Sequence, residues 1–312
     1  MNFLEQSYVS KLCFGTLSIS KFQSNLPLNV GIDLLSYARE RGINFFDTAE
    51  LYETYPYLKG LIKKYPDVII ATKTYAYSSE QTKNSLDKAL REIGRDYIDI
   101  FLLHEQESEL TIRGHIQALK ELHKAKSQGK IKAVGISTHN IAAVKAAIKF
   151  PEIEIIHPLY NYYGWGIKDG TAEEMLESIK KAYKYKKKIY AMKVLAGGHL
   201  YKESIKALRH VSYIPEFFSI AVGMKSKQEI EVNLSIIKGE TPNEKKIKEI
   251  IQLEKKLIVE EWCEGCGKCV ERCSQKALSI DSDTNKVKVD HSKCILCGYC
   301  ASVCSEFCLK VI

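Results

Sequence analysis

Short runs of β-branched and aromatic residues alternate, along the first three quarters of the chain, with longer stretches whose apolar residues recur every three or four positions. The short runs are typical of buried strands and the longer stretches of amphipathic helices. Strands are predicted at 11–17, 43–49, 67–73, 97–104, 132–137, 153–160, 188–195 and 217–223. Helices are predicted near 28–41, 55–65, 79–94, 113–129, 140–149, 172–187, 201–210 and 226–237. Eight of each in alternation predicts the α/β class and a (β/α)8 TIM barrel.

Length and composition fit one large domain with a small appendix. The chain has 312 residues, of which 45% are hydrophobic and 27% charged, as in a globular protein with a sizeable core. No apolar run approaches the roughly 18 residues needed to cross a bilayer, and the opening MNFLEQSYVSKLCFG lacks the regions of a signal peptide. We therefore expect no membrane association and a cytoplasmic location. The predicted divisions are a barrel over 1–237, a helical linker over 238–258 and a small domain over 259–312.

The net charge of +8 comes from the first 258 residues, because residues 259–312 contain seven basic and eight acidic side chains. Such an excess suits nucleic acid, an anionic cofactor or an acidic partner. The densest basic run, Lys184–Lys188, closes a predicted helix, where lysines favour the negative end of the helix dipole and stay solvated. Because no aromatic and glycine-rich binding motif accompanies the run, we expect no nucleic-acid partner.

Cysteine marks the small domain as a separate module. Eight of the ten cysteines lie between 263 and 304, in two runs of the form CxxCxxCxxxC. Disulfides are disfavoured in a reducing cytoplasm, and structural zinc usually takes two pairs of ligands from two separate knuckles. Three closely spaced thiolates followed by a fourth match the pattern that holds [4Fe-4S] clusters. The spacing therefore predicts iron–sulfur clusters.

The two cysteine runs resemble those of two-cluster ferredoxin domains, which implies an α+β ferredoxin-like fold for residues 259–312. In that family the fourth cysteine of each run binds the other cluster. The resemblance implies that one cluster is held by Cys263, Cys266, Cys269 and Cys304. It implies that the other is held by Cys294, Cys297, Cys300 and Cys273. Ser274 and Ser305 replace the usual proline, and we expect Cys13 and Cys308 to be packed residues rather than ligands.

Polar residues at the ends of three predicted strands are the candidates for catalysis. Chemistry in this fold collects at the carboxyl ends of the strands, where Asp47, Lys73 and His104 stand, and Tyr52 follows Asp47 in the same loop. Singly, the aspartate could cap a helix, the lysine could be solvated and the histidine could be a core residue. The strings GINFFDTAELY, IIATKT and IDIFLLH resemble the aldo-keto reductase superfamily across about residues 8–237. The resemblance implies that these four residues are its catalytic tetrad.

The tetrad residues suit the reduction of a carbonyl by hydride. The resulting alkoxide needs a proton, and a free tyrosine with a pKa near 10 holds its proton too firmly. We expect Lys73 to lower the pKa of Tyr52, Asp47 to hold Lys73 charged, and His104 to direct the carbonyl oxygen by hydrogen bonding. An aldehyde or ketone is the expected substrate, and the hydride requires a cofactor.

The same resemblance implies a nicotinamide cofactor, NADP(H) or NAD(H). AVGMKSKQEIEVNL resembles the segment that binds the adenosine phosphate in that family. Its implied contacts are Gly223, Lys225, Ser226, Gln228 and Asn233. The alternative interpretation is an ordinary barrel helix capped by Ser226. Near the nicotinamide, Ser137 matches the family, while Thr138, His157 and Met192 replace its usual Asn, Gln and aromatic residue. Gly197 and Gly198 leave room for a ligand or turn the chain.

The fused modules leave three functional hypotheses. A hydride carries two electrons and each cluster passes one, so a mediator must join the two kinds of step. The leading hypothesis is a carbonyl reductase with an electron-transfer module whose redox partner is a flavoprotein or another carrier. The second has the clusters feed a barrel-bound flavin, for which no motif is seen. The third is a binding scaffold with an idle tetrad and the clusters as an electron carrier or structural support.

Overall fold

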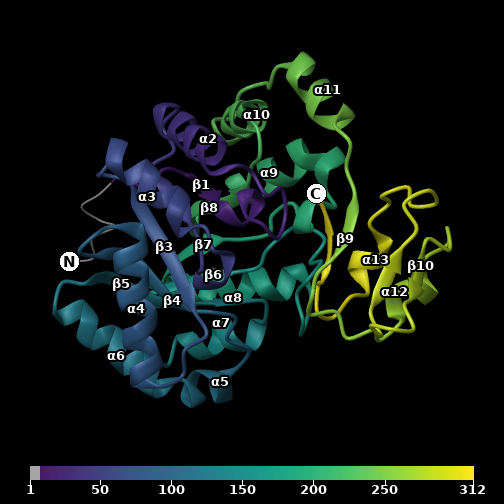
Figure 1. Cartoon of the computed structure of the whole chain (residues 1–312). Helices are drawn as coiled ribbons and strands as arrows, with labels where there is room; N and C mark the ends of the chain where they lie inside the picture. The colour runs from purple at the N-terminus through teal and green to yellow at the C-terminus, as the bar shows by residue number, and fades with distance from the viewer. Residues whose placement is uncertain (1–7) are drawn as a thin grey trace.

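The computed structural model describes residues 8–312, so part of the opening stretch used in the signal-peptide prediction lies outside the described residues. Eight parallel strands pair in chain order, and β1 pairs with β8 to close the barrel (Figure 1). The strands are β1 (Leu12–Gly15), β2 (Phe45–Asp47), β3 (Ile69–Thr74), β4 (Ile98–Leu103), β5 (Ile131–Thr138), β6 (Ile155–Pro158), β7 (Lys188–Ala191) and β8 (Phe217–Gly223). The predicted (β/α)8 barrel is therefore confirmed.

Helices surround the barrel and connect its strands. They are α2 (Leu28–Glu40), α3 (Tyr55–Lys64), α4 (Ser79–Ile93), α5 (Glu109–Gly114), α6 (Ile116–Ser127), α7 (Ile141–Ala147), α8 (Ala172–Lys184), α9 (Ser204–Ser212) and α10 (Lys227–Ile237). Short 3-10 turns are η1 (Thr16–Ile19), η2 (Glu50–Tyr52), η3 (Ala196–Gly198) and η4 (Tyr201–Glu203). Within residues 8–312 no helix is long and apolar enough to cross a membrane.

The single helix predicted near 113–129 is two helices. Ser108 caps the start of α5 five residues upstream of that prediction, with its side chain accepting a hydrogen bond from Thr111 N. The helix then ends before His115, whose Nδ1 contacts the carbonyl oxygen of Thr111 at 2.8 Å. A side chain that engages the last turn of one helix favours its termination there, so α6 begins as a new helix.

Two apolar layers stabilise the barrel. The inner layer fills the barrel itself and includes Cys13, Phe45, Ile100 and Tyr190, while a larger layer lies between strands and helices. Strands buried on both faces require continuous apolar runs rather than alternation, as the sequence has. Cys13 is fully buried in the inner layer, which confirms its expected role as a packed residue.

The Lys184–Lys188 run is not simply a solvated end of a helix, which corrects that expectation. Helix α8 ends at Lys184, and Lys187 is only 7% exposed. Its ammonium group donates to the carbonyl oxygens of Phe150 and Ile153 at 2.8 and 2.6 Å. The long lysine side chain thus ties the start of β7 to the loop before β6.

A second, smaller domain follows α11 (Glu244–Gln252) and packs against one side of the barrel (Figure 1). Its elements are β9 (Leu257–Val259), α12 (Lys268–Arg272), β10 (Leu278–Ile280), β11 (Val287–Val289), α13 (Tyr299–Ser302) and β12 (Leu309–Val311). Strands β9 and β12 pair antiparallel, as do β10 and β11. The linker helix therefore ends at Gln252, and Leu257 already belongs to a strand of the small domain.

The contact between the domains is apolar at its centre and polar at its edge. Phe307 and Ala301 of the small domain pack with Leu159, Ala196 and Leu200 of the barrel loops. At the edge, the ammonium of Lys168 lies 2.9 Å from the Glu306 carboxylate, and His199 Nε2 lies 3.0 Å from the carbonyl oxygen of Leu309. Burial of apolar side chains and polar contacts at the edge therefore both hold the small domain against the barrel.

Two glycines after β7 let the small domain approach the barrel backbone. Gly197 and Gly198 have φ values of +62° and +89°. A Cβ at Gly198 would overlap the carbonyl oxygen of Val311 in β12, and one at Gly197 would lie 2.8 Å from Lys310 Cδ. In this structure the space left by the two glycines is thus occupied by the small domain's own strand.

Gly198→Ala is therefore expected to loosen the small domain. Gly129→Ala is the matched control, because Gly129 also has a positive φ, +77°, but an added Cβ there meets nothing within 4 Å. Both variants lose about 1 kcal/mol from backbone strain, and only Gly198→Ala adds a collision with β12. Limited proteolysis should release the small domain from Gly198→Ala faster than from the control. Equal rates in the two variants would contradict the close approach.

Candidate active site and cluster sites

The barrel register brings Asp47 and Lys73 together. Asp47 pairs with Ala71 across β2 and β3, and Lys73 is two residues further along the same strand. Because side chains alternate between faces of a strand, Ala71 and Lys73 share a face, and Lys73 lies one step nearer the carboxyl end. Lys73 Nζ donates to Asp47 Oδ1 and Oδ2 at 2.6 and 2.8 Å and to the carbonyl oxygen of Thr48 at 2.7 Å. Both side chains are buried.

Tyr52 and His104 lie beside this ion pair. Lys73 Nζ is 5.3 Å from the centre of the Tyr52 ring, and the centres of the Tyr52 and His104 rings are 5.9 Å apart, edge to face. The His104 ring also stacks on Tyr75 at 4.4 Å. His104 Nδ1 is buried without a hydrogen-bond partner among the described residues. The four residues singled out in the sequence are thus neighbours at the carboxyl ends of β2, β3 and β4.

The electrostatics of Tyr52 differ from the expectation. Burial raises the pKa of its hydroxyl well above the usual value, and the carboxylates of Asp47 and Glu105 add to the rise. The expected lowering by Lys73 is not found, because the ammonium is paired with the Asp47 carboxylate, whose negative charge opposes its effect on Tyr52. Tyr52 is therefore protonated at neutral pH.

His104 is neutral at the same pH. Burial, followed by the charge of Lys73, lowers its pKa to about 3. A neutral imidazole carries one N–H donor, and His104 has an unpartnered ring nitrogen. The site therefore offers two neutral donors beside one buried ion pair.

Tyr190 is a member of the site that sequence reasoning missed. Its hydroxyl donates to Asp47 Oδ2 at 3.0 Å, and its ring stacks on His157 at 3.7 Å. It lies in the middle of the apolar run of β7, so only the closed barrel shows that it reaches Asp47. Tyr190 thus adds a hydrogen bond to the same Asp47 carboxylate that Lys73 holds.

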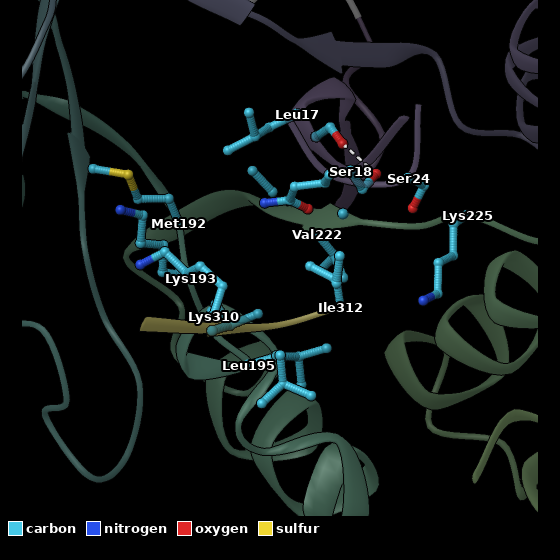
Figure 2. Close-up of a pocket in the computed structure, with 18 of the residues that line it drawn as sticks. Leu17, Ser18, Ser24, Met192, Lys193, Leu195, Val222, Lys225, Lys310 and Ile312 are labelled. Atoms are coloured by element: carbon cyan, nitrogen blue, oxygen red, sulfur yellow. Dashed lines mark hydrogen bonds between the residues drawn. The ribbon is translucent and has the colours of Figure 1, made fainter. Parts of the chain in front are cut away.

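A pocket opens from the tetrad toward the start of α10. Its lining includes Asp47 and Tyr52 of the tetrad, Lys225 and Glu229 near the start of α10, and Met192, Lys193 and Leu195 after β7. Figure 2 shows Lys193 and Lys310 across the pocket from Lys225. The small domain contributes Lys310, Val311 and Ile312 to the lining, which the sequence did not indicate.

Three of the eight residues expected to contact a nicotinamide cofactor line this pocket, namely His157, Gly223 and Lys225. Ser226 caps α10, accepting a hydrogen bond from Glu229 N at 3.2 Å. Gln228 is exposed and Asn233 is buried in the same helix.

The other two, Ser137 and Thr138, bind neighbouring loops. Ser137 Oγ accepts from Glu105 N at 2.9 Å, and Thr138 Oγ1 accepts from Asn140 N at 2.8 Å. The pocket lining therefore includes a cation and residues near the start of α10, groups of the kind that bind phosphate, together with Tyr52. Burial lowers the pKa of His157 to about 4, so this ring is neutral where it lines the pocket.

The eight cysteines of the two runs surround two separate hollows of the small domain. One hollow is lined by Cys263, Cys266, Cys269 and Cys304. The other is lined by Cys273, Cys294, Cys297 and Cys300. In each set the fourth cysteine comes from the other run, as the ferredoxin resemblance implies.

The donor sets fit [4Fe-4S] clusters. Four thiols that surround one hollow can each bind one of the four irons of a [4Fe-4S] cluster. Backbone amides of Ala277 and Cys308 also point at the sulfurs of Cys273 and Cys304, at 3.3 and 3.4 Å, as donors that tune such clusters do. Within residues 8–312 no three His, Cys, Asp or Glu side chains meet closely enough to hold one metal ion.

Cys308 is closer to the first hollow than the spacing suggested. It is buried, lines that hollow and lies 3.4 Å from Cys304, sulfur to sulfur. Its packed position agrees with the expectation, and the four run cysteines already complete the set of thiols.

Asp47→Asn is expected to destabilise the fold by about 3–5 kcal/mol, because it leaves the buried Lys73 ammonium without its counter-charge. The double variant Asp47→Asn/Lys73→Met removes both charges and should recover much of that loss. Urea denaturation of the two variants and the parent chain measures the difference. A double variant no more stable than Asp47→Asn would show that the ion pair is not the stabilising element.

Cys304→Ala is expected to lower bound iron by about half or more, since it removes one ligand of one cluster. Cys308→Ala is the matched control four residues away and should keep the full iron content. Iron and acid-labile sulfide per chain, measured after anaerobic purification, give the comparison. An equal loss in both variants would make Cys308 a ligand.

Comparison with known proteins agrees with both halves of the chain. Residues 11–217 match the model of the aldo/keto reductase family, and residues 255–305 match that of the 4Fe-4S dicluster domain. An aldo-keto reductase from Bacillus halodurans has a similar structure, with a TM-score of 0.61 at 20% identity over 78% of this chain and 93% of that one. This likeness supports the barrel fold.

Curated relatives match parts of the chain. The NADPH-dependent alpha-keto amide reductase of Saccharomyces cerevisiae is 30% identical over 121 residues, 36% of this chain and 39% of the relative. The NADH-specific methylglyoxal reductase of Escherichia coli is 24% identical over 181 residues, 49% of this chain and 56% of the relative.

The small domain has a relative of its own. The indolepyruvate oxidoreductase subunit IorA of Thermococcus kodakarensis is 43% identical over 47 residues, 15% of this chain and 7% of the relative. The chain spans only 39%, 46% and 58% of the length of the curated relatives from Saccharomyces cerevisiae, Glycine max and Arabidopsis thaliana. With a family model covering most of its barrel, this chain belongs to the aldo/keto reductase family of oxidoreductases and carries a 4Fe-4S dicluster domain after the barrel.

Proposed function

We propose that the protein reduces an aldehyde or ketone with NADPH or NADH and that its two [4Fe-4S] clusters exchange electrons with a redox partner. One observation carries the barrel half of this proposal. Tyr52 stands in the same pocket as Lys225, beside a buried Lys73–Asp47 pair and a neutral His104. A proton donor, a hydrogen-bonding clamp for the carbonyl oxygen and a cleft with a phosphate-binding cation are the parts that carbonyl reduction requires.

A nicotinamide cofactor supplies the hydride when bound, and residues of this chain form its binding site. Lys225 offers a cation for a phosphate at the mouth of the pocket, and the start of α10 adds backbone donors. Glu229 lines the same end, and its carboxylate accepts a hydrogen bond from Lys225 N at 2.7 Å. A carboxylate suits a ribose hydroxyl and a lysine suits a phosphate, so this end has groups for either dinucleotide.

Tyr52 is the proposed proton donor to the carbonyl oxygen. Its raised pKa keeps the proton on the phenol until negative charge develops on the substrate oxygen. Lys73 is proposed as a positioning residue, since its ammonium lies beside the Tyr52 ring while all three donors hold Asp47 and Thr48. Pairing with Lys73 offsets the charge of the Asp47 carboxylate, which would otherwise oppose the loss of the Tyr52 proton more strongly.

His104 is the proposed clamp on the carbonyl oxygen. Its ring is held by stacking on Tyr75, and its low pKa keeps it neutral. A neutral N–H orients the oxygen toward Tyr52 without competing with it as an acid. Two donors on one oxygen polarise the carbonyl before the hydride arrives.

The small domain is proposed as an electron-transfer module. Cys266 and Cys297, one from each hollow, are exposed, so both cluster sites reach the protein surface. One-electron carriers and a two-electron hydride donor exchange electrons only through a group capable of both steps. We therefore propose a flavoprotein or similar carrier as the redox partner and a reducing, cytoplasmic setting for the clusters.

Tyr52→Phe is expected to lower turnover of simple aldehydes with NADPH or NADH by at least about 100-fold, because it removes the proton donor. Tyr213→Phe is the control, since Tyr213 is 74% exposed and outside the pocket lining. Anaerobic initial rates, with bound dinucleotide measured separately, test the role. Full activity in Tyr52→Phe with unchanged dinucleotide binding would rule out the proposed chemistry.

A further inference from the structure

Two lysines from different domains share one wall of the pocket. Lys193 follows β7 of the barrel, and Lys310 lies in β12 of the small domain. Figure 2 shows them next to each other, with their side chains extending toward Met192. Both ammonium groups also flank the ring of Phe307, at 5.4 and 3.6 Å from its centre. The domain contact therefore gathers two positive charges in one place.

Neither ammonium group has a carboxylate partner. Lys193 Nζ lies 3.0 Å from His139 Nε2, and Lys310 Nζ donates to the carbonyl oxygen of Phe307. Among residues 8–312, no carboxylate oxygen is found within 4.0 Å of either nitrogen. Lys310 is only 3% exposed, so water cannot replace the missing partner fully. Buried cations are ordinarily paired, which makes this pair unusual.

The electrostatic surroundings of Lys193 and Lys310 favour the binding of an anion. Burial, followed by repulsion from Lys193, lowers the pKa of Lys310 well below its usual value. Glu260 and Glu105 are the carboxylates whose charges act on Lys193 from a distance. Glu260 Oε1 is itself buried without a hydrogen-bond partner, and burial raises the pKa of this carboxyl. A ligand oxygen between the two ammonium groups would relieve their repulsion directly.

We propose that Lys193 and Lys310 form an anion-binding site that takes a phosphate or carboxylate group of the pocket's ligand. The site lies in the same pocket as Tyr52 and Asp47, so one ligand can contact the two lysines and Tyr52 at the same time. The anion belongs either to the carbonyl substrate or to the diphosphate of the dinucleotide, and both are bound by the same chemistry. The identity of the ligand rests on the proposed function, whereas the anion site does not.

Half of this site is supplied by the cluster domain. Lys310 lies six residues after Cys304, and β12 is held by pairing with β9 and by contact with Gly197 and Gly198. Ligand affinity in the barrel pocket therefore depends on the correct seating of the small domain. This gives the fusion of the two domains a role in binding besides electron transfer.

Lys193→Met and Lys310→Met test the site in the full-length, cluster-loaded protein, with Lys288→Met on the exposed face of β11 as the matched control. Methionine keeps the length and apolar packing of the buried lysine stem, and unchanged iron content verifies the fold. Calorimetric titration with inorganic diphosphate, NADP+ and NAD+ measures binding without turnover. Each pocket variant should lower the affinity for the ligand whose anion binds there by about 10- to 100-fold. This is the range expected for the loss of a hydrogen bond to a charged group.

Steady-state rates with benzaldehyde and 4-carboxybenzaldehyde identify the source of the anion. Weaker binding of diphosphate and dinucleotides in both pocket variants supports the site and assigns the anion to the cofactor. A raised KM for the carboxylated aldehyde alone, with benzaldehyde unchanged, supports the site and assigns the anion to the substrate. Variants that match the control in every titration and in both KM values overturn it.

The same experiment separates this inference from the proposed function. If the parent chain reduces neither aldehyde but binds diphosphate through Lys193 and Lys310, the anion site stands and carbonyl reduction of these probes fails. If the parent chain reduces benzaldehyde through Tyr52 and both lysine variants match Lys288→Met, the reductase stands and the anion site fails.

Discussion

The close approach of strand β12 to the Gly197–Gly198 turn constrains the whole structure. No Cβ fits at Gly198, so the backbone of the small domain lies directly on the loop that follows β7. Phe307 is buried at this contact, and Lys310 is turned into the barrel pocket. Because the pocket wall is made from both domains, neither the cleft nor its charge can be described from the barrel alone.

The pocket contains two pairs of charged groups with different arrangements. Lys73 and Asp47 form a closed ion pair with every ammonium donor used, which fixes the floor of the site. Lys193 and Lys310 are two like charges without a carboxylate in contact, which leaves an attraction for an incoming anion. In the proposed reaction the first pair holds the surroundings of Tyr52 in place, and the second pair is the proposed binding site for an anionic ligand beside it.

Local patterns in the sequence were enough to predict the barrel and both candidate sites. Strand periodicity placed Asp47, Lys73 and His104 at strand ends, and parallel strands in one barrel bring such ends to the same face. The cysteine spacing likewise predicted iron–sulfur clusters, and the resemblance to two-cluster ferredoxins implied the crossed fourth cysteines that the two hollows have. These features depend on residues close in sequence or on a regular repeat.

Features that depend on distant packing could not be predicted in the same way. Lys193 and Lys310 are separated by more than a hundred residues and meet only because the small domain docks on the barrel. The raised pKa of Tyr52 depends on burial and on the nearby carboxylates of Asp47 and Glu105, which only the folded barrel brings around the hydroxyl. Tyr190 looks like an ordinary apolar strand residue until the barrel closes.

The barrel and the small domain line one pocket jointly, and we propose that a single ligand contacts both. Hydrogen–deuterium exchange of the anaerobic, cluster-loaded protein, with and without saturating NADP+, tests this shared binding. We expect the dinucleotide to slow exchange both in the barrel segment 15–24 and in the terminal segment 309–312 of the small domain. Protection of the barrel segment with no change in the terminal segment would contradict a shared pocket.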